Sequence, residues 1–142
     1  MQVQERTVIT VQTVVNAPID KVWKIWNNPT DIKIWCTSNP EWQTPVKVND
    51  LKAGGKFVFR MEAKDGSIGY DYDCVYDVVR VNEYIEYHTS DKRDVKINFT
   101  SNGNQTTVVQ NLEANSEIPI EYQRGGWEAI MVNFKKYVES KN

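Results

Sequence analysis

The sequence contains one histidine and two cysteines in 142 residues, and this scarcity excludes several kinds of site. A metal site with several histidines cannot be built on His88 alone, and Cys36 and Cys74 lack the paired spacing of zinc ligands. We therefore expect two reduced thiols, no metal and no cofactor. Ser-His catalysis is disfavoured because there is no G-x-S-x-G motif, and Gly54-Gly55 lacks the Gly-Lys-Ser/Thr that completes a phosphate-binding loop. We place His88 at the surface or at a strand edge.

Long apolar runs and large clusters of one charge are also missing. Lys plus Arg number 17 and Asp plus Glu 19, for a formal net charge of -2. The longest basic clusters, Lys92-Arg93 and Lys135-Lys136, are too small for a nucleic-acid or anionic-membrane surface. No stretch reaches the roughly 18 apolar residues of a membrane span, and the first residues lack the features of a secretory signal. We expect a cytoplasmic protein with no nucleic-acid or membrane partner.

The length of 142 residues is that of one domain. A chain of this size buries roughly 68–70% of its unfolded surface, so neither a disulfide nor a metal is needed for stability. No repeat, low-complexity segment or linker is visible. We expect a monomeric single domain over residues 1–142.

The segment 119–139 has the pattern of one long amphipathic helix. Spacings of three, four and seven place its large apolar residues on one face, which Gln123 shares; these are Ile120, Trp127, Ile130, Met131, Phe134 and Val138. We expect Trp127 at the centre of the contact between this helix and the rest of the fold. Gly125-Gly126 is costly in a helix, which indicates a kink or close packing contact in preference to a gating hinge.

The segment before residue 46 predicts a strand and two short helices. Residues 7–15 alternate as a strand, Asn16-Ala17-Pro18 has the pattern of a helix cap, and helical spacing continues until Asn27-Asn28-Pro29. A second helix is expected over residues 30–35, followed by a loop over residues 38–45 that contains Trp42.

The segment 46–114 predicts about six short strands in hairpin sequence. Alternating residues are separated by turn signals such as Asp65-Gly66 and Asn102-Gly103. Strands that follow one another, with helices before and after them, indicate an α+β fold with an antiparallel sheet.

One of these strands is unusual because it carries tyrosines at alternate positions. Tyr70, Tyr72 and Tyr76, with Cys74 and Val78, occupy the face that we expect to point inward. A buried hydroxyl without a partner costs about 1–3 kcal/mol, so three of them suggest a roomy, wet interior. Polar side chains at Gln110 and Gln123 would contribute to it. Carboxylates on the opposite face are expected to be solvated rather than to bind metal; they are Asp71, Asp73 and Asp77.

Three blocks of sequence resemble the Bet v 1/START-type helix-grip superfamily and, more narrowly, its Aha1-like SRPBCC domains, the family of activators of Hsp90 ATPase. The blocks are Asn16-Ala17-Pro18 leading into Val22-Trp23-Lys24-Ile25-Trp26, the turn from Asp50 to Phe57, and Gly126-Trp127 followed by Phe134, Tyr137 and Glu139. The resemblance implies a curved seven-stranded antiparallel sheet wrapped around a long C-terminal helix, two short helices after the first strand, and a cavity between helix and sheet. It does not imply one chemistry, because the fold serves carriers, enzymes and chaperone partners.

We expect the cavity to bind a small hydrophobic or amphipathic molecule without catalysis. The alternative is a co-chaperone-like protein-interaction domain with a chaperone partner, and a polyketide cyclase-like enzyme is the third hypothesis. The expected cavity lining is Trp35, Trp42, Phe57, Phe59, Met61, Tyr70, Tyr72, Tyr76, Gln110, Gln123, Trp127, Ile130, Met131 and Phe134.

Overall fold

The computed structural model describes residues 7–141, which form three helices and eight strands. The strands are β1 (Val8–Val15), β2 (Trp42–Gln43), β3 (Val46–Asn49), β4 (Lys56–Ala63), β5 (Gly69–Arg80), β6 (Tyr84–Thr89), β7 (Asp94–Asn102) and β8 (Gln105–Glu113). The helices are α1 (Ile19–Asn27), α2 (Pro29–Trp35) and α3 (Ile120–Ser140). The expected single domain also includes residues 1–6 and 142, which lie outside the described residues.

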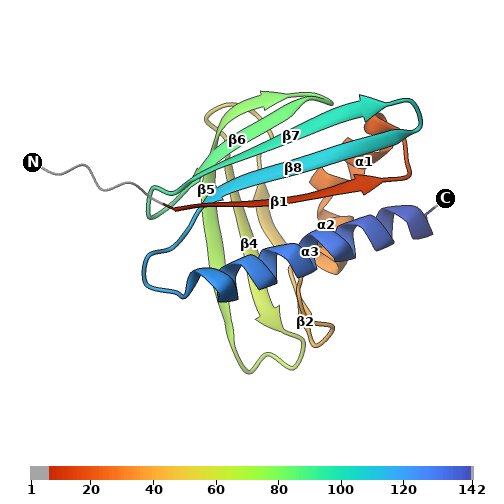
Figure 1. Cartoon of the computed structure of the whole chain (residues 1–142). Coiled ribbons are helices and arrows are strands. Elements are labelled where there is room, and N and C mark those ends of the chain that lie inside the picture. Colours follow the sequence, from red (N-terminus) through yellow and green to blue (C-terminus); the bar gives the residue numbers. More distant parts are fainter. Residues whose placement is uncertain (1–6, 142) are drawn as a thin grey trace, which may run out of the picture.

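All strands pair antiparallel in one curved sheet of order β1-β8-β7-β6-β5-β4-β2, with β3 also paired to β4 (Figure 1). The α+β helix-grip fold expected from the sequence is confirmed, and its seven strands correspond to β1 and β3 to β8. The two-residue strand β2 is an addition, formed where Trp42 and Gln43 of the expected loop pair with Ala63 and Glu62. No helix in residues 7–141 is long and apolar enough to cross a membrane.

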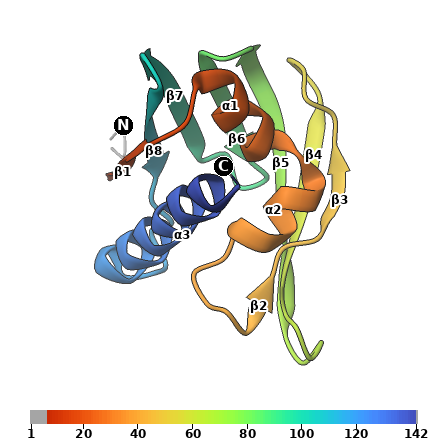
Figure 2. The same ribbon diagram turned by 90° about the vertical axis from the view of Figure 1, so that its right-hand side faces the viewer.

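Helix α3 packs mainly along β1, and its C-terminal half also contacts α1 and α2 (Figures 1 and 2). The centre of this contact is Phe134, whose side chain has no solvent exposure. Its ring meets those of Trp26 and Trp35 edge-on, at centroid distances of 4.8 and 4.7 Å. Trp127 is only partly buried, so the expectation that it forms the centre is wrong. It lies two turns nearer the start of the helix, away from this aromatic cluster.

Strand β5 does not keep one alternation along its whole length. The register between β5 and β6 shifts between Tyr76 and Val78. A bulge of this kind exchanges the two faces of a strand. Val79 therefore packs against the core where Val78 was expected.

The start of α1 also differs from the expected cap. Pro18 is the N-cap residue, and no side chain caps the helix. Asn16 instead connects distant segments, because its N–H donates to Glu139 Oε2 at 2.9 Å and its Oδ1 accepts from Gln105 Nε2 at 2.7 Å.

Candidate functional site

A cavity of about 40 Å³ lies between the sheet, α3 and the two short helices. It is lined by Trp26, Asn27, Ile32, Trp35, Cys36, Phe57, Phe59, Met61, Tyr72, Tyr76, Ile85, Tyr87, Ile97, Gln110, Trp127 and Ile130. Nine of the fourteen expected lining residues are among them: Trp35, Phe57, Phe59, Met61, Tyr72, Tyr76, Gln110, Trp127 and Ile130.

Gln110 provides a polar side chain whose hydrogen-bonding capacity is unused within residues 7–141. It is 4% exposed, and its strand neighbours across the sheet are Val11 and Ile97. No described residue makes a hydrogen bond to its side-chain amide. The amide atoms are nevertheless reached from the cavity, because no fully enclosed side-chain N or O atom of the described residues lacks a partner. A water or a bound molecule in the cavity can therefore pair with this amide.

The tyrosines of the lining pair with protein groups. Tyr72 and Tyr87 share a hydrogen bond of 3.0 Å between their hydroxyl oxygens, and Tyr76 donates to Asn49 Oδ1 at 2.7 Å. Burial raises the pKa of all three tyrosines, which therefore remain neutral at physiological pH. The interior is consequently less roomy and less wet than three inward tyrosines suggested.

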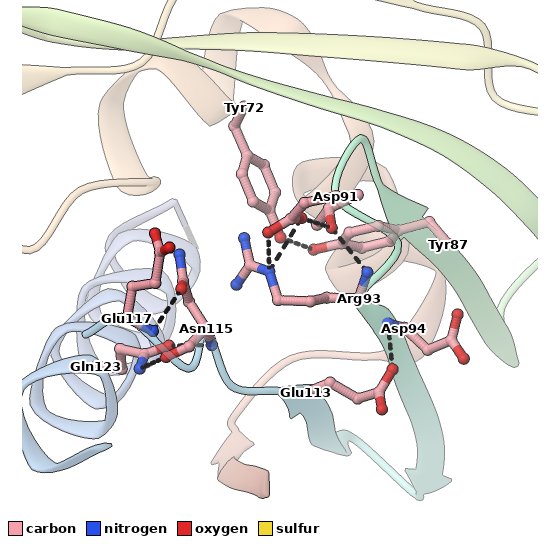
Figure 3. A network of polar contacts seen from close by, with 10 residues as sticks. Tyr72, Tyr87, Asp91, Arg93, Asp94, Glu113, Asn115, Glu117 and Gln123 are labelled. Carbon is pink, nitrogen blue, oxygen red and sulfur yellow. Dashed lines mark hydrogen bonds and ion pairs between the residues drawn. The ribbon is translucent and has the colours of Figure 1, made fainter. Parts of the chain in front are cut away.

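Gln123 is buried as expected but has a different role. Its Oε1 accepts from Asn115 N–H at 2.8 Å, and its Nε2 donates to the carbonyl of Asn115 at 2.8 Å (Figure 3). Its Nε2 also donates to the carbonyl of Ile118 at 2.8 Å. Asn115 in turn accepts from Glu117 N–H at 2.9 Å. The Gln123 amide is thus used to hold the loop before α3, and the expectation that it serves the cavity is wrong.

The four other expected residues lie elsewhere. Met131 and Phe134 are buried in the core and do not line the cavity. Tyr70 is 55% exposed, so its expected inward position is wrong: it lies at the start of β5, opposite Met61. Trp42 lines a groove on the outside of the molecule.

The prediction missed several lining residues, of which Trp26 and Tyr87 have the largest side chains. Both were visible in the sequence, Trp26 through its helical spacing in residues 19–27 and Tyr87 through its alternation with Ile85. Local spacing shows that these residues lie on apolar faces. It does not show that the two faces line the same cavity, because that depends on how α1 and β6 are placed relative to each other.

The cavity is small compared with sites of about 300–1,000 Å³ that hold drug-sized ligands. About 10–15 Å³ suffices for one water molecule, so the cavity admits a few waters or one small polar group. Trp127 and Ile130 of α3 complete the lining, and the Trp127 ring lies 6.0 Å from that of Tyr72. A larger molecule would have to displace the partly buried Trp127.

The glycine pair before Trp127 has no packing role within the described part of the chain. A Cβ built at Gly125 or Gly126 meets no atom within 4 Å. Of the expected kink or close packing contact, the contact is therefore wrong; α3 is one continuous helix from Ile120 to Ser140. The glycine pair therefore weakens α3 locally, next to Trp127, whose side chain closes the cavity.

A second, external hollow of about 1020 Å³ lies between α2, the segment 37–46 and the C-terminal half of α3. Its wall combines Trp42, three prolines and two lysines, Lys33 and Lys64. Neither lysine forms an ion pair with another residue in 7–141. We call this hollow the α2 groove.

The outer face of the sheet carries paired charges, as expected for a solvated surface. Asp71 is near Lys47 and Arg60, at 3.3 and 3.5 Å, and Asp73 is near Lys56 at 3.6 Å. His88 lies on this face, with Nδ1 3.0 Å from Asp77. Because β6 pairs on both sides, His88 is a surface residue but not a strand-edge residue.

A curved antiparallel sheet that holds a long C-terminal helix over a mainly apolar cavity defines the class of helix-grip domains. The sequence model of the family described as "Activator of Hsp90 ATPase homolog 1-like protein" matches residues 16–139. The chain therefore belongs to this family.

Solved structures agree with this assignment. The AHSA1-like protein from Aeromonas hydrophila is 32% identical, with a TM-score of 0.88 over 95% of this chain and 94% of that one. The protein Chr148 from Cytophaga hutchinsonii is 47% identical, with a TM-score of 0.79 over 94% and 92%. A protein from Chromobacterium violaceum, 18% identical with a TM-score of 0.84 over 94% and 98%, shares the fold. No curated protein matches the chain.

Proposed function

We propose that the protein binds a small hydrophobic or amphipathic molecule in the cavity between α3 and the sheet, without changing it chemically. The single observation that carries this proposal is Gln110, a 4% exposed side chain that lines the cavity and has no partner in the described structure. An apolar site with a few polar groups is typical of small-molecule binding.

The composition of the lining supports binding over catalysis. General acid-base chemistry needs a titratable group with a pKa near the working pH. No Asp, Glu, His or Lys is among the lining residues of the described structure. Burial raises the pKa of the Cys36 thiol to about 12, so it supplies no thiolate at neutral pH. A polyketide cyclase-like activity has no acid-base pair here.

Native mass spectrometry and NMR together test the proposal. We expect freshly purified protein to retain a small molecule, or stripped protein to bind indole with shifts at Trp127, Tyr72 and the Gln110 side-chain amide. A matched control is Tyr122→Ala, which truncates a 79% exposed aromatic residue on the same helix and should leave binding unchanged. Absence of a retained molecule, together with absence of indole shifts, would overturn the proposal.

A second candidate function, a co-chaperone-like interaction, is favoured by the α2 groove. The groove is large, it contains Trp42 and prolines, and its Lys33 and Lys64 form no ion pair with another residue in 7–141; these features suit an acidic segment of a partner protein. We expect the protein to raise the ATPase rate of an Hsp90-type chaperone, and Lys33→Glu with Lys64→Glu to abolish this. Lys96→Glu on the outer face of β7 is the control. An unchanged ATPase rate with wild-type protein would exclude this candidate.

A further inference from the structure

The polar groups of the cavity differ in whether they are already paired. The hydroxyls of Tyr72 and Tyr87 bond to each other, and that of Tyr76 bonds to Asn49. The Gln110 side chain offers an unused N–H₂ donor and an unused carbonyl acceptor within the described residues. Asn27, the other amide of the lining, already donates from Nδ2 to the carbonyl of Trp23 at 2.9 Å. A ligand group that presents one acceptor and one donor side by side can satisfy both at once.

The lining carries no charge in the part of the chain that the structure describes. Its titratable members stay protonated, because burial raises the pKa of Tyr72, Tyr76, Tyr87 and Cys36. A charged ligand would lose its hydration in this site without gaining an ion pair, which is strongly unfavourable.

A cation close to the tyrosine pair is Arg93, which acts electrostatically on Tyr72 and is drawn with it in Figure 3. It is not part of the cavity lining. Its Nε donates to both carboxylate oxygens of Asp91, at 3.0 and 2.9 Å, so its charge is already balanced. Arg93 therefore gives an anionic ligand little compensation.

Aromatic rings make up much of the wall, including those of Trp26, Phe57, Tyr87 and Trp127. Several meet edge-on, such as Phe57 and Tyr87 at a centroid distance of 4.8 Å and an interplanar angle of 86°. A flat ring that takes the place of the Trp127 side chain would keep such contacts.

We propose that the ligand is an uncharged aromatic molecule bearing an amide-like group, and that the Gln110 side chain pairs with this group through two hydrogen bonds. This inference rests on the proposed function. It narrows the ligand class, since an amphipathic acid would be disfavoured in its ionised form.

Three probes with the same ring test it: indole, and the nearly isosteric pair indole-3-carboxamide and indole-3-carboxylate. Each is titrated at pH 7 into wild-type protein and followed by NMR. We expect the carboxamide to bind about tenfold or more tightly than the carboxylate, and more tightly than indole. In Gln110→Met, which keeps the unbranched shape, the carboxamide should lose its advantage over indole while indole still binds. The control is Gln12→Met, the same change at an exposed position on β1.

The outcomes separate the inference from the proposed function. Equal or tighter binding of the carboxylate, or an unchanged carboxamide advantage in Gln110→Met, would overturn the inference and leave ligand binding itself intact. Binding of none of the three probes would overturn the inference, and together with the absence of a retained molecule it would overturn the proposed function as well. If Gln110→Met does not fold, the comparison of carboxamide with carboxylate in wild type still decides whether charge is excluded.

Discussion

At the scale of single residues, Gln110 and Gln123 show how one residue type acquires opposite roles. Both are buried, at 4% and 8% exposure. The amide of Gln123 makes three hydrogen bonds to the backbone of the 115–118 loop. Gln110 is surrounded on its sheet by apolar residues and faces the cavity. Only Gln110 is thus available to a ligand.

We predict that Gln110→Met leaves the free protein at least as stable as wild type, with a gain of up to about 1 kcal/mol, because it removes a largely buried amide that only water in the cavity can satisfy. Chemical denaturation measures this. A clear loss of stability would show that Gln110 has a structural role. Gln123→Met is the contrasting variant, expected to lose about 1–3 kcal/mol as backbone groups of the loop lose their partners.

Phe134 and Trp127 give a second prediction. Phe134→Ala should cost about 3–5 kcal/mol, because it leaves a cavity between Trp26 and Trp35. Trp127→Ala should cost less than about 2 kcal/mol, because its side chain is only partly buried. Urea unfolding of both variants checks the order. Equal losses would place Trp127 in the core and argue against its role as the movable wall of the cavity.

At the scale of elements, α3 combines a firmly packed C-terminal half with a weaker N-terminal half. The C-terminal half contains Met131, Phe134 and Val138, which are all buried. The N-terminal half contains Gly125 and Gly126, which weaken a helix by about 1 kcal/mol each relative to alanine. Access to the cavity is therefore expected beside Trp127, on the weaker half.

We predict that Gly125→Ala and Gly126→Ala each raise the free energy of unfolding by about 0.5–1 kcal/mol, because an added Cβ meets no atom within 4 Å. If the glycines permit α3 to open, the double variant should also bind indole more slowly, which stopped-flow fluorescence measures. A stabilised variant with an unchanged association rate would indicate that ligand access does not depend on this segment.

At the scale of the whole molecule, Glu139 joins the end of α3 to the segment that follows β1. Its carboxylate accepts from Asn16 N–H at 2.9 Å and from Lys135 Nζ at 2.8 Å. Hydrogen bonds from Lys135 and from the Asn16 backbone lower the pKa of Glu139 below its ordinary value. The charged form is therefore favoured in the folded state. Its contribution to stability is present above the ordinary glutamate pKa and is lost as pH falls through the lower, folded value.

We predict that Glu139→Gln lowers the melting temperature at pH 7 and that the difference from wild type shrinks as the pH is lowered to about 3. Thermal unfolding across this range tests the sign. Glu128→Gln, at an exposed position of the same helix, is the control and should show no such trend. A difference that stays constant with pH would mean that the Glu139 charge is not what connects α3 to Asn16.

Local pattern determined most of the secondary structure. The 3.6-residue period of residues 120–140 and the two-residue period of the strands follow from the directions in which successive side chains point, so these elements could be predicted within a residue or two. The resemblance supplied their arrangement around α3. The two-residue period predicted the wrong face for Val78, beyond the bulge between Tyr76 and Val78. A bulge depends on how a strand pairs with its neighbour, which the strand's own sequence does not specify.

Tertiary structure alone decided which polar and aromatic residues belong to the site. Helical period placed Trp127 and Phe134 on one face, yet only Phe134 meets Trp26 and Trp35, since α1 and α2 cover the C-terminal half of α3. Likewise, nothing local distinguishes Gln110 from Gln123. Gln123 lies within hydrogen-bonding distance of loop carbonyls and Gln110 does not. Such distances are set when the elements of the fold pack together, so the local sequence does not specify them.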